Sequence, residues 1–163
     1  MNRFLILVII HFSFITNGQE IILEFNTDYD AGPSSIDNSF SLVNENNNDF
    51  TVFLTNKSNL SAFNYNSSFE LQGWLASRQL LNKYKLPLGG TVSNKKYSLF
   101  YSNNTNSKFA LVTFDFEKMS SFASEIELNL KKEIYLTQFV FKNKFHFLTT
   151  TYRENKLYIY SFN

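Results

Sequence analysis

The segment Phe50-Thr-Val-Phe-Leu-Thr55 occurs in three related versions along this 163-residue chain. The other two are Tyr97-Ser-Leu-Phe-Tyr-Ser102 and Phe145-His-Phe-Leu-Thr-Thr150, which follow at intervals of 47 and 48 residues. Aromatic and aliphatic side chains dominate all three versions, and aromatic and β-branched side chains pack well on a pleated sheet surface. The pattern therefore predicts three equivalent β-strands.

A polar turn and a second strand follow each of these segments. The turns are predicted at 56–59, 103–110 and 151–156, where Asn, Lys, Ser and Thr predominate and can satisfy backbone groups locally. The second strands are Leu60-Ser-Ala-Phe-Asn-Tyr-Asn66, Leu111-Val-Thr-Phe-Asp-Phe-Glu117 and Leu157-Tyr-Ile-Tyr-Ser-Phe-Asn163. Both faces of these hairpins carry apolar residues, so we expect sheets that are covered on both sides.

The stretches between the hairpins also favour strands. Residues 124–130 alternate polar and apolar side chains, and 134–141 form a further apolar run. Residues 71–81 fit either a strand or a short helix. Each unit of about 47 residues has room for roughly four strands, so we predict an all-β fold of about three four-stranded antiparallel units.

A four-stranded unit that recurs every 40–50 residues or so resembles the blade of a β-propeller. The resemblance covers residues 37–163, in units of approximately 37–83, 84–131 and 132–163, and it implies an incomplete propeller-like fold. The chain lacks the Gly-His and Trp-Asp signature of WD40 blades and the paired glycines of kelch repeats, so the resemblance implies no functional residues. A β-sandwich or an open meander is the alternative architecture.

The number of units raises the question of how the fold is completed. Propellers typically close with about four to eight blades, and the third unit stops at Asn163, after its second hairpin strand. Three explanations are open: the chain is the front part of a longer protein, it assembles with other chains, or strand 21–25 completes the last unit. We prefer the first. An unpaired sheet edge would also permit self-association.

The amino terminus predicts export. Arg3 precedes an apolar run from Phe4 to Ile15, and small residues follow before a cut after Gly18. This pattern is typical of a cleavable signal peptide, here residues 1–18, and the run is too short for a membrane span of about 20 residues. We expect a secreted or periplasmic protein without a membrane span after cleavage, with a β-repeat region at 19–163.

Composition excludes several classes of partner and site. Without Arg3 the count of Lys and Arg falls from 15 to 14, which equals the count of Asp and Glu. Nucleic acids and anionic membranes require clustered basic residues, and only isolated pairs such as Lys95-Lys96 occur. The chain has no Cys, so disulfides are excluded, and His146 is the single His beyond the leader, which rules out the usual zinc sites.

The acidic segment 28–37 is the best candidate for a metal site. Asp28 and Asp30 precede a glycine, and Asp37 closes the segment. Alternating acids before a glycine are typical of oxygen-rich calcium loops. The third acidic position and the terminal Glu of an EF-hand are missing, so an ordinary loop is the alternative reading.

Four other side chains are candidates for chemistry. Asp115 and Glu117 are predicted on one face of a strand, where two carboxylates could serve glycosidic cleavage. The aligned positions of the other units hold Asn or Ser, which favours a polar strand end. His146 is predicted to be a strand-face residue, because no nucleophile and carboxylate accompany it. Trp74 could stack on a sugar ring, but we expect it in the core.

These patterns indicate no catalytic residue and no cofactor. We therefore expect an exported, non-catalytic binding or scaffold protein, the N-terminal part of a larger propeller, with a protein or a glycan as its partner. The alternative is a fragment of a carbohydrate-active hydrolase or lyase with a propeller fold, whose catalytic groups converge from several units.

Overall fold

The computed structural model describes residues 37–56, 59–77, 83–126, 133–151 and 156–162. Among these residues, strands form three antiparallel sheets of four, four and three strands, and there is no helix. The predicted all-β class is therefore confirmed. The leader predicted at 1–18 and the strand predicted at 21–25 lie outside the described residues.

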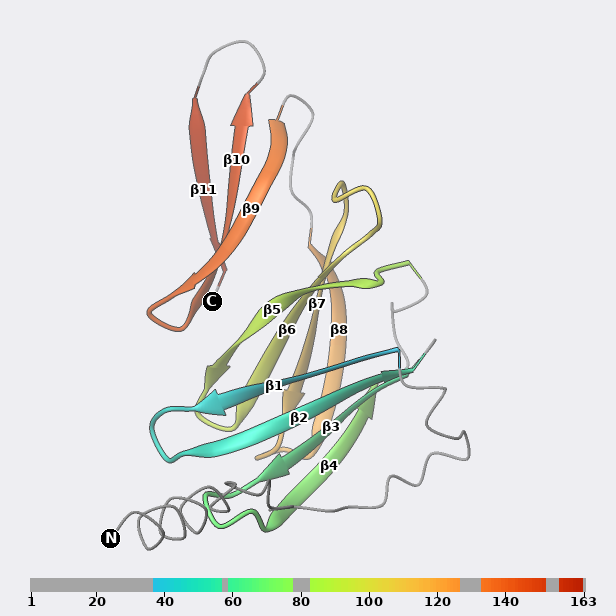
Figure 1. Ribbon diagram of the computed structural model, residues 1–163, viewed down its shortest axis with the longest axis vertical. Coiled ribbons are helices and arrows are strands. Elements are labelled where there is room, and N and C mark those ends of the chain that lie inside the picture. Colours follow the sequence, from blue (N-terminus) through green and yellow to red (C-terminus); the bar gives the residue numbers. More distant parts are fainter. Residues whose placement is uncertain (1–36, 57–58, 78–82, 127–132, 152–155, 163) are drawn as a thin grey trace, which may run out of the picture.

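The three sheets follow one another along the chain (Figure 1). The first contains β1 (Asn38–Asn44), β2 (Asp49–Asn56), β3 (Asn59–Tyr65) and β4 (Leu71–Ser77). The second contains β5 (Leu86–Ser93), β6 (Lys96–Ser102), β7 (Phe109–Asp115) and β8 (Ser120–Ile126). The third contains β9 (Glu133–Phe141), β10 (Lys144–Thr151) and β11 (Leu157–Phe162). Strands adjacent in sequence pair within each sheet, so each sheet is an up-and-down meander. The stretch that fitted either strand or helix is the strand β4 over its described part.

The hairpins β2–β3, β6–β7 and β10–β11 share one register. Phe50, Tyr97 and Phe145 each lie opposite a valine on the preceding strand and an aromatic residue on the following strand. The three sets are Val43–Phe50–Tyr65, Val92–Tyr97–Phe114 and Val140–Phe145–Phe162. The three aromatic residues therefore occupy the same position in their sheets.

One alignment based on the sequence pattern is wrong by two residues. The sequence pattern aligns Phe116 with Tyr65, which lies opposite Phe50. In the second sheet, the residue opposite the equivalent Tyr97 is Phe114 and not Phe116. The cause is that β7 begins at Phe109, two residues earlier than the aligned segment. Because strand side chains alternate between faces, a shift of two residues leaves every side chain on its face and the apolar pattern intact.

The first two sheets pack face to face. We call the face that carries Phe50, Tyr97 or Phe145 the rear face of its sheet, and the opposite one the forward face. The forward face of the first sheet packs on the rear face of the second. The core cluster at this junction includes Phe53, Leu60 and Ala62 of the first sheet and Tyr97, Leu99, Tyr101, Val112 and Phe114 of the second. Asn64 Nδ2 also donates a hydrogen bond to the Tyr97 hydroxyl over 3.1 Å, so a polar contact crosses the apolar core.

The second and third sheets pack in the same order of faces. Phe100 and Phe109, on the forward face of the second sheet, meet Phe145 and Phe147 on the rear face of the third, and each of the four is 2% exposed or less. Gln138 Nε2 adds a hydrogen bond of 3.0 Å to a main-chain carbonyl of β5. Burial of one Phe side chain contributes about 1.5–3 kcal/mol, so this aromatic cluster holds the third sheet in place.

The order of the sheets leaves two outer faces. β1 contacts β5, and β5 contacts β9, so the first strands of the three sheets adjoin. Within the described residues, no sheet covers the rear face of the first sheet or the forward face of the third. The described part of the chain is therefore an open stack of three sheets (Figure 1).

Candidate functional site

A small hollow lies where the first strands of the three sheets adjoin. Its volume is about 140 Å³. All three sheets contribute to its lining, which consists of Leu42, Val43, Asn44, Glu45, Gly90, Thr91, Val92, Val140 and Asn143. Because no single sheet supplies this lining, the hollow exists only in the stacked structure.

The β1–β2 turn at the hollow is fixed by asparagines. Asn44 is buried, donates from Nδ2 to the carbonyl of Asn94 over 2.7 Å, and accepts from the Asn46 backbone N–H at 3.2 Å. Asn48 has a φ of 58°, in the left-handed region that Asn enters more readily than most residues. These contacts tie the first sheet to the second and place Glu45 at the hollow.

The turns of the other two sheets are shorter. Asn94 opens the two-residue β5–β6 turn with a φ of 55°, and Lys142 and Asn143 form the β9–β10 turn with φ values of 49° and 58°. Two-residue turns with positive φ match the twist of the strands that they join. The tight β9–β10 turn thereby brings Asn143 to the hollow.

A glycine is required where β5 passes the hollow. A Cβ atom on Gly90 would lie 2.6 Å from Leu42 Cδ1 and 2.6 Å from the Ser98 carbonyl oxygen. Atoms in proteins do not approach so closely, so only glycine permits the first sheet to lie this near to β5.

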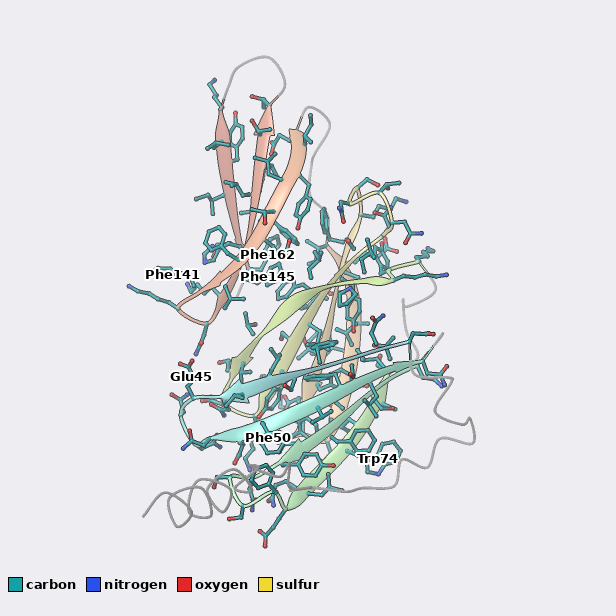
Figure 2. The ribbon with its side chains drawn as sticks, in the orientation of Figure 1. Glu45, Phe50, Trp74, Phe141, Phe145 and Phe162 are labelled. Carbon is teal, nitrogen blue, oxygen red and sulfur yellow. The ribbon has the colours of Figure 1, made fainter. Side chains whose placement is uncertain are left out.

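The polar groups of the hollow suit binding. Glu45 and Asn143 are exposed there, and Thr91 is half-buried. Figure 2 shows Glu45 on the β1–β2 turn, below the β9–β10 turn. Glu45 is the one acidic residue of the lining, whereas glycosidic cleavage ordinarily uses two carboxylates. The hollow can therefore accept and donate hydrogen bonds, but its lining does not form a carboxylate pair.

The predicted calcium loop is mostly beyond the described residues. Asp28 and Asp30 lie outside them. Asp37 is exposed, and its backbone N–H donates to the Thr55 carbonyl over 2.8 Å, which continues the pairing of β1 with β2. The described residues contain no group of three or more His, Asp or Glu side chains arranged to hold a metal ion.

The prediction that Asp115 and Glu117 share a strand face is wrong. Asp115 ends β7, and Glu117 lies in the turn beyond it. Asp115 Oδ1 accepts hydrogen bonds from the backbone N–H groups of Lys118 at 3.0 Å and Glu117 at 3.1 Å, and Oδ2 lies 3.6 Å from Lys96 Nζ. The Lys118 bond, followed by the Lys96 charge, holds the pKa of Asp115 below its usual value although burial opposes this shift. Asp115 thus caps a turn.

Asn66 has the same role in the first sheet. Its Oδ1 atom accepts hydrogen bonds from the backbone N–H groups of Glu70 at 2.9 Å and Ser68 at 3.0 Å. Asn66 follows Tyr65 as Asp115 follows Phe114, so the two turn caps are at equivalent positions. Equivalent capping supports a structural role for Asp115.

His146 lies on the forward face of the third sheet. Its ring stacks on Phe139, with ring centroids 4.9 Å apart and an angle of 15° between the planes. Neither ring nitrogen has a hydrogen-bonding partner within the described residues. His146 is therefore placed on a strand face, without the oriented carboxylate and nucleophile that a catalytic base needs.

Trp74 is not in the core, contrary to the expectation from sequence. It is 57% exposed on the rear face of the first sheet, where it lies opposite Phe63 on the neighbouring strand. Val43, Phe69 and Leu71 are also exposed around this rear face. The predicted burial is wrong because, among the described residues, no other sheet packs on this face.

The forward face of the third sheet is the second exposed apolar surface. Its exposed side chains are Ile134, Phe139, Phe141, Leu157 and Ile159. Lys142 Nζ lies 5.4 Å from the ring centroid of Phe141, which Figure 2 shows at the end of β9. Contiguous exposed apolar surface is typical of interaction sites.

No helix among the described residues is both long and apolar enough to cross a membrane. Comparison with protein families, with curated proteins and with solved structures found no match to this chain. The functional reading therefore depends on the geometry of the hollow and of the two exposed faces.

Sequence reasoning missed the residues of the hollow. Glu45, Gly90 and Asn143 belong to three different sheets, and only the stacking brings them together. Part of the site could have been found from sequence, because a turn that contains asparagine directly follows the first strand of each sheet. Which turns adjoin depends on the order of the faces, which the sequence pattern does not specify.

Proposed function

We propose that this protein is an exported, non-catalytic β-repeat protein whose three sheets form part of a larger propeller and present a binding or scaffold surface. The hollow at the ends of the first strands is the proposed ligand site, and a protein or glycan is the proposed ligand. The observation that carries this proposal is the common register of the three hairpins together with the constant order of faces.

The position of the hollow supports a binding role. In propellers the first strands of successive blades surround the central channel, and the loops at its ends carry function. Here β1, β5 and β9 adjoin in that order, and the turns after β1 and β9 supply Glu45 and Asn143. A carboxylate beside an amide can hold the hydroxyl groups of a sugar or the polar groups of a peptide.

A glycan array probed with the purified protein tests the proposal. Glycans that bind are then titrated against Glu45→Gln and Asn143→Ala. We expect a tenfold or greater loss of affinity for Glu45→Gln, since a hydrogen bond to a charged group contributes about 1.5–3 kcal/mol, and a loss of about two- to tenfold for Asn143→Ala, since a neutral hydrogen bond contributes about 0.5–1.5 kcal/mol. Glu117→Gln is the matched control, because Glu117 is an exposed acid that does not line the hollow.

Two results would count against the proposal. Glycan binding that is unchanged in Glu45→Gln and Asn143→Ala would exclude the hollow as the site. Turnover of a polysaccharide by the wild-type protein would replace the binding role by the alternative, a carbohydrate-active hydrolase or lyase.

A further inference from the structure

The forward face of the third sheet repeats the positions that form the two internal junctions. Leu148 and its cross-strand partner Ile159 stand in the same register as Phe53 and Ala62 in the first sheet. In the first sheet, Phe53 and Ala62 are both fully buried under the second sheet. In the third sheet, by contrast, Ile159 is 63% exposed.

The rear face of the first sheet carries the complementary positions. Trp74 lies opposite Phe63, and Ala123 lies opposite Val112 at the equivalent point of the second sheet. Ala123 packs into the junction with the first sheet, whereas Trp74 is exposed. One chain therefore presents a forward face and a rear face of the kind that pair twice inside it.

We propose that a second copy of this chain seats the rear face of its first sheet on the forward face of the third sheet. This contact continues the internal order of faces, so it is head-to-tail and uses different surfaces on the two copies. It rests on the proposed function, because it supplies sheets to the larger propeller. It also differs from association through an open sheet edge, since sheet faces and not strand edges meet.

The number of sheets favours a closed dimer. Two copies contribute six sheets, and propellers close with about four to eight blades. In such a ring the third sheet of each copy packs on the first sheet of the other copy. Both outer faces of each copy are then buried. If the contacts did not close into a ring, one rear face and one forward face would stay exposed at the ends of the assembly, and further copies would add there to form a filament.

The mass of the purified protein in solution, measured by light scattering after size exclusion, tests the proposal. We expect twice the mass of one chain for the wild type. Ile159→Glu and Trp74→Glu place a charge in either half of the junction, and each is expected to give a monomer. Phe122→Glu is the matched control, because Phe122 is an exposed aromatic on the forward face of the second sheet, outside the two outer faces that are proposed to meet. This variant is expected to remain a dimer.

Mixing the two monomeric variants separates this contact from a symmetric one. Ile159→Glu retains an intact rear face and Trp74→Glu an intact forward face, so the mixture is expected to form a heterodimer through one undamaged junction. Leu157→Glu and Leu71→Glu repeat the test at neighbouring exposed positions, and circular dichroism of every variant shows whether the β fold is retained.

Three results would overturn the proposal. The first is a wild type that remains monomeric at concentrations up to about 100 µM. The dissociation constant would then exceed about 100 µM, and the free energy of association would be weaker than about 5.5 kcal/mol. The second is a dimer that survives Trp74→Glu but not Ile159→Glu, which would show pairing of two third sheets. The third is failure of the mixed variants to associate. A monomer that still binds glycans through the hollow would leave the proposed function standing.

Discussion

Phe100 and Phe145 stack across the junction of the second and third sheets, with ring centroids 3.8 Å apart and planes 8° apart. Phe53 and Tyr97 hold the equivalent positions at the junction of the first and second sheets, where the centroids are 6.3 Å apart and the planes are tilted by 57°. Both junctions therefore join a forward face to a rear face at the same register, with different ring geometry. Aromatic pairs tolerate both arrangements.

Phe147→Ala is expected to lower the free energy of unfolding by about 3–5 kcal/mol, because it leaves a cavity in the cluster formed with Phe100, Phe109 and Phe145. Urea unfolding followed by circular dichroism measures the loss. Phe122→Ala, at an exposed position, is expected to change stability by less than about 0.5 kcal/mol. Equal effects of the two substitutions would contradict the aromatic cluster as the support of the third sheet.

Gly90→Ala is expected to destabilise the protein by about 1–3 kcal/mol, because the new methyl group overlaps Leu42 and the Ser98 carbonyl oxygen. Gly73→Ala is the matched control. Its Cβ would meet the flexible end of Met119 at 3.4 Å, an approach that a small rotation relieves. Thermal unfolding compares the two variants, and a Gly90→Ala protein as stable as the wild type would contradict the close approach of Gly90 to Leu42 and to the Ser98 carbonyl oxygen.

The strands could be predicted from sequence, whereas the arrangement of the site could not. Alternation of apolar residues identified the hairpins, because strand periodicity is a local property of the chain. The register of β7 was missed because Phe114 and Phe116 both fit the pattern two residues apart. Glu117 was misplaced because the capping role of Asp115 ends the strand earlier than the pattern suggests.

The hollow illustrates a different limit. Glu45 and Asn143 are turn residues of the first and third sheets, and their proximity depends on which faces pack together. Trp74 shows the same limit, since an apolar residue on a predicted strand is buried only if another sheet covers it. Local patterns establish the units of this fold, but the pairing of faces is a property of the whole stack.

Tyr101→Phe is expected to make the protein less sensitive to alkaline pH. Burial raises the pKa of Tyr101 from 10.0 to about 12. Between these values the unfolded chain loses the phenolic proton and the folded chain keeps it, so stability falls as pH rises, by about 1.4 kcal/mol per pH unit for this group. Removal of the hydroxyl should reduce that slope.

Urea unfolding at intervals from pH 9 to 12 measures the slope for the wild type and for Tyr101→Phe. Burial also raises the pKa of Tyr97, so the slope is expected to decrease but not to vanish. Tyr158→Phe, at a more exposed position, serves as the control. An identical slope in the wild type and Tyr101→Phe would show that the Tyr101 hydroxyl titrates as freely as in the unfolded chain.

Asp115→Asn is expected to lower stability at neutral pH and to have a smaller effect in acid. The pKa of Asp115 lies below 3.8 in the folded chain, chiefly because the Lys118 backbone N–H donates to the carboxylate. A lowered pKa stabilises the folded state above the unfolded pKa, and this contribution is lost as the pH falls through the folded pKa. Asparagine keeps an acceptor oxygen for the turn but loses the attraction to Lys96.

Thermal unfolding between pH 2 and 7 should therefore show the wild-type and Asp115→Asn midpoints converging below about pH 3.8, with Glu117→Gln parallel to the wild type throughout. Midpoints that stay equally far apart at every pH would mean that the carboxylate charge contributes nothing and that the turn depends on hydrogen bonding alone.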